Sequence, residues 1–329
     1  MERLPGTGVM GKNMQVQPAQ YEPLVSAVII THNRKKLVQG AIASVLNQTY
    51  RNIELFVVDD ASEDGTKELL EKKAAADNFT YIHIPKSESK GGNHARNVGV
   101  RMSKGEYVAF LDDDDEWLPQ KTEKQVEFLQ NHPECGVVAC FNIVEFDFKD
   151  RYPENRDGMM EGDLHERIFS WIPFVTSVAM YRRQVLEEAG LFDENLRYWQ
   201  EFDLNIRVAQ IAEIGCVHEE LGLYRVVNKD KNRLTNQLDG WMKAVDYIEK
   251  KYRKLIRKLP RDIYRKHRLL IAGDGANRAF ITGNKKMEWK YLLIVFRLDP
   301  SAKNLAKLVL RVSGYNKARD FKNWLIRKK

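Results

Sequence analysis

The chain has 329 residues, a length that predicts two domains and excludes a peptide-sized module. Hydrophobic residues make up 43% and charged residues 30%, which is the composition of a globular protein and not of a disordered or fibrous one. No apolar run reaches the roughly 18 residues that a membrane-spanning helix needs. The three cysteines lack the spacing of metal ligands, so we expect reduced thiols and no disulfide framework.

The net charge is +7, but the basic residues gather near the C-terminal end of the sequence. Between Lys250 and Lys329 there are 24 lysine and arginine residues against 5 aspartate and glutamate residues, so the rest of the chain is acidic. An acidic body with a basic tail predicts that the tail meets an anionic partner, either a membrane surface or nucleic acid.

The first 150 residues alternate between strand-like and helix-like patterns. Residues 1–23 are polar and lack the apolar core of a secretory signal, so we expect a flexible leader. VSAVIITH then predicts a strand buried on both faces, and Lys35 to Gln48 has helical spacing. The pattern repeats with strands at IELFVVDD, YIHIP, EYVAFLDDDD and GVVACF and with helices at about 63–76, 94–103 and 119–131. This alternation predicts an α/β sheet whose ligands bind at the carboxyl ends of its strands.

The alternation weakens after Asn142. We expect a strand at FVTSVAMY, helices at about 183–189 and 200–211, and a last strand at LGLYRV, which completes a first domain at 24–238. Residues 239–329 predict a basic, all-helical region with turns at Gly283-Asn284, at 299–301 and at Gly314. Residues 269–300 resemble one helical hairpin of the tetratricopeptide type, which must pack on the body, a partner or lipid.

Two expected strands end in carboxylates. The four aspartates Asp112 to Asp115 follow YVAFL, and a purely structural role would make them a solvated turn. At the end of a buried strand they predict instead an oxygen-rich site for Mn²⁺ or Mg²⁺, completed by phosphate oxygens. Asp59 and Asp60 end IELFVVDD; Ser62 or Asp64 can cap the next helix, which leaves the aspartate pair, and a carboxylate there can accept the imide N–H of uracil or thymine.

Four segments, in the order in which they occur, resemble the family 2 glycosyltransferases over about residues 24–225. They are VSAVIITHNR, IELFVVDDASEDGT, GGNHARNVGVRMSKGEYVAFLDDDD and YWQEFDLNIR. The resemblance implies a GT-A fold, which is a Rossmann-like mixed α/β sheet flanked by helices. It also implies metal-dependent, inverting transfer of a sugar from a nucleotide-diphosphate donor, with a UDP-sugar as first choice. The acceptor would be a hydroxyl of a glycan or of a lipid-linked sugar, in bacterial surface polysaccharide synthesis.

The resemblance assigns roles to individual residues. The segments that match nucleotide and diphosphate contacts supply the expected donor-binding residues, which are Thr31, Asn33, Arg34, Asp60, Arg96, Asn97, Asp112 and Asp113. The metal ligand would be Asp114 or Asp115, and the metal Mn²⁺ or Mg²⁺. The general base would come from Gln200-Glu201-Phe202-Asp203, where Glu201 falls on the family's usual aspartate and Asp203 on the next one. This departure leaves open which of the two is the base.

The resemblance also implies a basic side chain that closes over the diphosphate from a loop after the last strand. Arg225, Lys229 or Arg233 could neutralise the charge of the leaving group, although a solvated basic loop would have the same composition.

Two other functions fit the sequence less well. A sugar-phosphate nucleotidyltransferase needs a glycine-rich phosphate-binding loop, and HNRKK follows the first expected strand instead. A nucleic-acid-binding protein would use the basic tail, but the aromatic residues there share helical faces with leucine and valine, so we expect no nucleic acid partner. We expect the tail to hold a cytoplasmic enzyme peripherally on the anionic inner face of the plasma membrane. The alternative is a basic helical domain that only braces the body or a second subunit.

Overall fold

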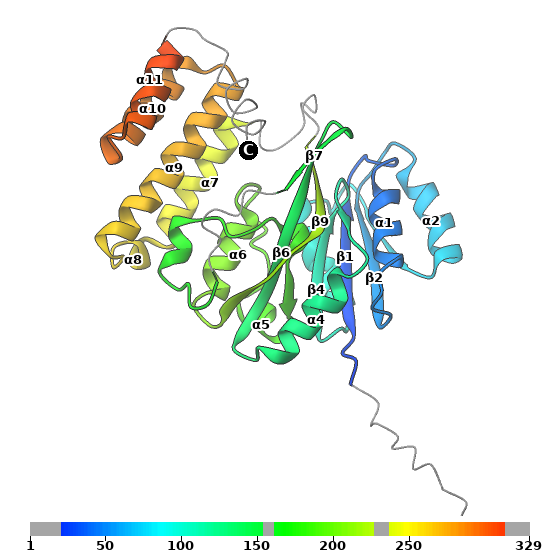
Figure 1. Ribbon diagram of the computed structural model, residues 1–329. Helices are drawn as coiled ribbons and strands as arrows, with labels where there is room; N and C mark the ends of the chain where they lie inside the picture. Colours follow the sequence, from blue (N-terminus) through cyan, green and yellow to red (C-terminus); the bar gives the residue numbers. More distant parts are fainter. Residues whose placement is uncertain (1–20, 154–160, 227–236, 313–329) are drawn as a thin grey trace, which may run out of the picture.

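The computed structural model describes residues 21–153, 161–226 and 237–312. Residues 1–20 of the leader expected at 1–23, the loop residues Lys229 and Arg233 and the turn at Gly314 lie outside these ranges. A mixed nine-stranded sheet with the order β3-β2-β1-β4-β8-β6-β9-β5, and with β7 paired to β6, forms the centre of the molecule (Figure 1). Its strands are β1 Val25–Thr31, β2 Ile53–Asp60, β3 Thr80–Ile84, β4 Tyr107–Asp112, β5 Glu116–Trp117, β6 Cys135–Phe146, β7 Asp150–Pro153, β8 Met180–Arg182 and β9 Glu213–Val226.

The four N-terminal strands of the fold, β1 to β4, pair in parallel. In their register Thr31 lies beside Asp59, and Ile30 lies beside Asp112. The carboxyl ends of these strands therefore meet at one edge of the sheet, as the sequence predicts. Strand β8 runs antiparallel to β4 and to β6, which makes the sheet mixed.

Helices cover both faces of the sheet. They are α1 Val38–Leu46, α2 Thr66–Asp77, α3 Gly92–Met102, α4 Lys121–Asn131, α5 Arg183–Glu188, α6 Gln200–Val208, α7 Leu238–Lys251, α8 Arg253–Ile256, α9 Arg261–Ile281, α10 Lys285–Leu298 and α11 Ala302–Val312. Alternate strand residues point to opposite faces, so Ala27 and Ile29 pack with α1 and α4, whereas Val28 packs with α3 and α6. Both faces are buried, which explains why these strands read as continuous apolar runs.

The C-terminal helices stand beside the sheet next to α6, away from α1 and α2 (Figure 1). Trp241 of α7 and Ile271 of α9 belong to the same apolar cluster as Phe202 of α6. Helices α9 and α10 form the expected hairpin, with Gly283 at the turn in the left-handed region at φ 72°. None of the helices in the described part of the chain is both long and apolar enough to cross a membrane.

The sequence pattern is wrong in two places. The strand expected at FVTSVAMY is reduced to β8, because Thr176–Val178 forms a 3₁₀ turn whose Ser177 hydroxyl bonds to Asp115 and to the backbone N–H of Asp112. The break expected after Asn142 is absent, because β6 continues to Phe146 between β7 and a β9 that begins at Glu213. Contacts between segments that are distant in the sequence decide both cases.

Candidate active site

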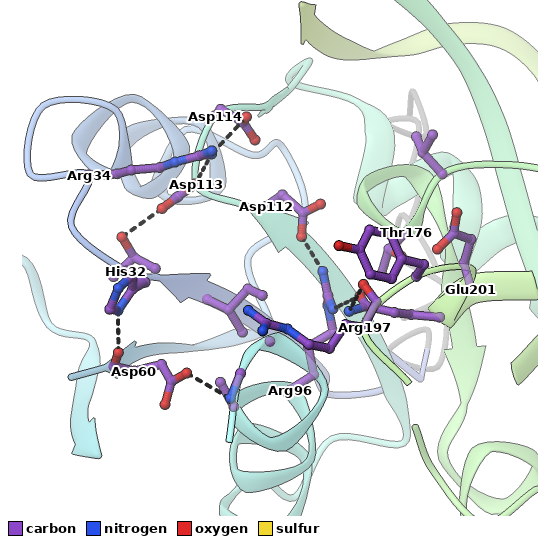
Figure 2. A pocket seen from close by; sticks show the side chains of 18 of the residues that line it. His32, Arg34, Asp60, Arg96, Asp112, Asp113, Asp114, Thr176, Arg197 and Glu201 are labelled. Carbon is purple, nitrogen blue, oxygen red and sulfur yellow. Dashed lines mark hydrogen bonds and ion pairs between the residues drawn. The ribbon is translucent and has the colours of Figure 1, made fainter. Parts of the chain in front are cut away.

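A pocket of about 1000 Å³ opens at the carboxyl edge of the parallel strands. Its walls come from the ends of β1, β2 and β4, from the starts of α3 and α6, and from α9. In Figure 2, Asp60 and Glu201 lie on opposite sides of this pocket, with Asp112 and Arg96 between them. The fold therefore brings together segments that are up to about 250 residues apart in the chain, from Ile30 to Arg278.

The turn after β4 is held by the loop after β1. The Thr31 hydroxyl donates to Asp113 Oδ2 at 2.7 Å, and Arg34 Nη1 lies 3.0 Å from Asp113 Oδ1 and 2.8 Å from Asp114 Oδ2. Burial raises the pKa of Asp113 to about 7, although the Arg34 guanidinium opposes this shift. Arg34 thus balances the charge of two neighbouring carboxylates that would otherwise repel each other.

Asp112 and Arg96 form an ion pair in the middle of the pocket. Arg96 Nη2 lies 2.6 Å from Asp112 Oδ1, and Arg96 Nη1 donates to Gln200 Oε1 at 2.8 Å, which connects α3 to α6. The Arg96 side chain is 5% exposed, whereas that of Asp112 is 37% exposed. Arg96 Nε is buried without a hydrogen-bond partner among the described residues. A buried cationic donor of this kind suits an anionic ligand.

Asp60 lies at the far side of the pocket from Glu201. Its Oδ2 accepts a hydrogen bond from the backbone N–H of Gly91 at 2.9 Å, while its Oδ1 is buried with no partner in the described part of the chain. His32 Nδ1 donates to the Asp60 carbonyl oxygen at 2.5 Å. Asn33 is in the left-handed region at φ 54°, and its side-chain oxygen accepts from the backbone N–H of Glu63. The loops after β1 and β2 are therefore tied together around one unpaired carboxylate oxygen.

Glu201 lies in the first turn of α6 and lines the pocket. The residue before this helix, Trp199, has a left-handed backbone at φ 55°, and its indole N–H donates to Asp274 Oδ2 of α9 at 3.1 Å. Burial raises the pKa of Glu201, whereas Arg96 and Arg278 lower it. A carboxylate with a raised pKa is a stronger base than a solvated one.

Three expected site residues lie outside the pocket lining. Asp203 is fully buried, and it contacts Arg207 Nη2 and Lys251 Nζ, each at 2.7 Å, and the Tyr252 hydroxyl at 2.8 Å. Asn97 and Asp115 likewise bond to the protein itself. The Asn97 amide bonds to the backbone of Phe192 and to Glu194, and Asp115 accepts from Ser177 and from the backbone of Arg225.

The basic residues around the pocket differ from those expected after the last strand. Arg225 forms two ion pairs, from Nη1 to Glu116 Oε1 at 2.9 Å and from Nε to Glu145 Oε2 at 2.8 Å. It does not line the pocket. Arg197 and Arg278 line it instead. Arg197 precedes the recognisable YWQEFD motif, so its position could have been noticed, but only the packing of α9 brings Arg278 to the site.

The pocket is compatible with a divalent metal if a phosphate-containing ligand supplies part of the coordination. Among the described residues no three histidine, cysteine, aspartate or glutamate side chains are grouped to enclose an ion. Asp112 and Asp114 both line the pocket with partly exposed carboxylates, 37% and 24% exposed. Such oxygens fit Mn²⁺ or Mg²⁺ when phosphate oxygens supply the remaining ligands.

Comparisons with known proteins agree with this geometry. An uncharacterized glycosyltransferase of Rickettsia typhi is 30% identical over 67% of this chain and 70% of its own length. An Escherichia coli protein named as a UDP-Glc:α-D-GlcNAc-diphosphoundecaprenol β-1,3-glucosyltransferase is 37% identical over 32% of this chain and 41% of its own length. The solved structure of a Pyrobaculum calidifontis mannosyltransferase with GDP-Man and Mn²⁺ has a TM-score of 0.60 at 19% identity, and it covers 92% of this chain and 84% of that one.

The glycosyl transferase family 2 model matches residues 26–190, which is half of the chain and includes β1 to β4 with the acidic turn of the pocket. The expected family, the GT-A fold and the enzymatic character are thus confirmed. The chain belongs to glycosyl transferase family 2.

Proposed function

We propose that this enzyme is a metal-dependent, inverting glycosyltransferase that uses a UDP-sugar. The observation that carries this proposal is the arrangement of one pocket, with the unpaired oxygen of Asp60 at one side, the aspartates after β4 in the middle and Glu201 opposite. A nucleotide sugar has the same sequence of groups, which are a base, a charged diphosphate and a sugar.

The donor would lie across the ends of the parallel strands. Asp60 Oδ1 would accept the imide N–H of uracil, which gives this buried oxygen the partner that the protein does not supply. Thr31, Asn33 and Arg34 shape the loop beside it, and Arg96 would meet the diphosphate through its unpaired Nε. The E. coli relative, whose name includes UDP-glucose, supports the choice of uracil.

Asp114, with Asp112, would hold Mn²⁺ or Mg²⁺ together with the diphosphate. A bound ion of this kind supplies positive charge that stabilises the departing diphosphate. Asp115 supports the same turn from beneath, because it is buried against Ser177 and the backbone of Arg225.

Glu201 would take the proton from the acceptor hydroxyl as this oxygen attacks the anomeric carbon. Attack from the side opposite the diphosphate inverts the configuration at that carbon. Asp203 is the weaker candidate for this role, because its two oxygens already bind Arg207, Lys251 and Tyr252. Arg197 and Arg278 line the same pocket and add positive charge near the leaving group.

The acceptor would be a glycan or a lipid-linked sugar of a bacterial surface polysaccharide. The E. coli relative is named for such an acceptor, and a putative teichuronic acid biosynthesis glycosyltransferase of Bacillus subtilis is 37% identical over 33% of this chain. The basic C-terminal region would hold the enzyme on the anionic inner face of the plasma membrane, since each lysine or arginine near such a surface contributes about 1 kcal/mol.

A thermal-shift screen tests the donor and the metal together. UDP-sugars with Mn²⁺ should raise the melting temperature more than the same sugars with a chelator or than GDP-sugars with Mn²⁺. A larger shift with GDP-sugars would overturn the uracil assignment, and equal shifts with chelator would overturn the role of the metal.

Vesicle flotation tests the membrane proposal. The full chain should float with phosphatidylglycerol vesicles and be released by high salt, and a chain ending at Val312 should float less because it lacks six basic residues. Equal flotation with uncharged phosphatidylcholine vesicles would contradict it.

A further inference from the structure

A second groove, of about 460 Å³, adjoins the nucleotide pocket on the side of the C-terminal helices. It lies between the segment at Ile172 and helix α9, and it shares Trp199, Glu201 and Arg278 with the larger pocket. Glu201 is therefore reached from both sides. A group in the groove and a sugar in the pocket would meet at this carboxylate.

Helix α9 provides most of the groove wall. Leu269, Leu270 and Gly273 form its apolar part, and Asp274, Asn277 and Arg278 form its polar part. Helix α9 spans Arg261–Ile281, which is outside the segment that the family model matches. Most of the groove wall therefore comes from outside the segment that the family model matches.

The junction between groove and pocket is held in place by a small network. Asp274 Oδ2 accepts from Trp199 Nε1 at 3.1 Å and from Arg278 Nε at 3.2 Å. The Arg278 guanidinium also lies 5.5 Å from the ring centre of Trp241, and the residue is 8% exposed. Trp199 directly precedes α6, so this network also fixes where the helix of Glu201 begins.

We propose that this groove binds the sugar of the acceptor, so that helix α9 selects which acceptor reaches Glu201. This inference rests on the proposed function of the larger pocket. A sugar ring presents C–H faces to apolar side chains and hydroxyls to polar ones, and the groove offers both kinds within one α9 wall. A bare alkyl chain would fill the same space but would leave Asp274, Asn277 and Arg278 facing apolar groups.

Gly273 gives a direct way to test the groove. It lies in the interior of α9, and a Cβ atom built there has no neighbouring atom within 4 Å. A side chain added at this position would therefore start from open space in the groove. Leucine and alanine are also better helix formers than glycine, so neither replacement should weaken α9.

The experiment compares Gly273→Leu with its matched control Gly273→Ala in the full chain. The probes are methyl and octyl glycosides of glucose, galactose, mannose, rhamnose, N-acetylglucosamine and N-acetylgalactosamine, with the best nucleotide sugar from the thermal-shift screen as donor. The readout is nucleotide release with and without each glycoside, and release without glycoside measures transfer to water.

At least one methyl glycoside should stimulate nucleotide release by the wild type and by Gly273→Ala. Gly273→Leu should reduce this stimulation by about 10-fold or more and leave transfer to water and the melting temperature unchanged. Equal stimulation of both variants would overturn the proposal, and so would stimulation by octyl glycosides alone, which would assign the groove to an alkyl chain. Absence of both donor binding and nucleotide release in the wild type would instead contradict the proposed function.

Discussion

The turn after β4 and the first turn of α6 are both acidic, but each divides its carboxylates between the pocket and the protein interior. In the β4 turn, Asp112 and Asp114 are partly exposed to the pocket, whereas Asp115 is buried against Ser177. In α6, Glu201 lines the pocket and Asp203 is buried among Arg207, Lys251 and Tyr252.

The two turns achieve this division by different geometry. Residues two apart in a helix point to different sides, so Glu201 and Asp203 cannot share an environment. In the β4 turn the backbone leaves the strand, and two hydroxyls donate hydrogen bonds to alternate carboxylates. Thr31 donates to Asp113, and Ser177 donates to Asp115. Neighbouring acidic residues of one motif therefore have different roles. Replacement of those in the pocket should affect catalysis or donor binding, and replacement of the buried ones should affect stability.

Replacement of Glu201 by glutamine should have the largest effect on chemistry. The amide keeps the shape of the side chain but cannot accept the acceptor's proton, so sugar transfer should fall by about 100-fold to 10,000-fold. Steady-state transfer assays measure this loss, and isothermal titration with the donor should find unchanged binding. If Glu201→Gln turned over at the wild-type rate while a folded Asp203→Asn protein were inactive, the base would be Asp203.

Replacement of Asp203 by asparagine should have the largest effect on stability. The change leaves Arg207 and Lys251 without the fully buried carboxylate that both contact. Breaking a buried ion pair in this way costs about 3–5 kcal/mol in the free energy of unfolding. Urea denaturation followed by tryptophan fluorescence measures it. A loss below about 1 kcal/mol, the range of exposed ion pairs, would contradict the structural role.

Asp114 and Asp115 provide the same contrast in the β4 turn. Asp114→Asn should weaken metal-dependent donor binding by about 10-fold or more, because it removes a charged metal ligand. Asp115→Asn should change donor binding little. Burial and the neighbouring Asp114 raise the pKa of Asp115 well above its usual value. The uncharged amide of asparagine therefore resembles the protonated form of Asp115. Titration of donor against Mn²⁺ measures both, and equal effects would show that the division proposed for this turn is wrong.

The pH dependence of transfer should report the burial of Glu201. Because burial raises the pKa of Glu201, the base should lose activity as the pH falls through a value above 4.5, the ordinary pKa of glutamic acid. Asp113, whose pKa burial raises to about 7, should affect donor binding instead, since it holds Thr31 and Arg34. Separate pH profiles of kcat and of donor Kd distinguish the two groups. An acid limb of kcat at or below 4.5 would contradict the assignment of Glu201.

The sequence predicted the parallel half of the sheet well because β1, β2 and β4 are largely apolar on both faces and end in a polar run. The same pattern located Thr31, Arg34, Asp60 and the β4 aspartates at one edge. It could not separate Glu201 from Asp203, since their environments depend on α7, which lies about 40 residues further along the chain.

The sequence also did not predict that α9 lines the pocket and the groove. The segment GDGANR at Gly273 to Arg278 matches a dinucleotide-binding glycine pattern only superficially, because it lacks the third glycine and does not follow a strand. Packing of α9 against Trp199 and Trp241 brings Arg278 to the pocket and Gly273 to the adjoining groove. The bounds of β6 and β9 were missed for a related reason, because these strands are defined by pairing with each other across about 70 residues of sequence.

The order of strands has a consequence for how the protein is synthesised. Strands β1 to β4 can pair with one another as soon as they leave the ribosome, since all four lie within residues 25–112. Strand β5, at Glu116–Trp117, has β9 as its one partner strand among the described residues and must wait for about 100 further residues. Because N-terminal segments fold first during synthesis, we expect the nascent chain to form the parallel half of the sheet while the half that carries Glu201 is still open.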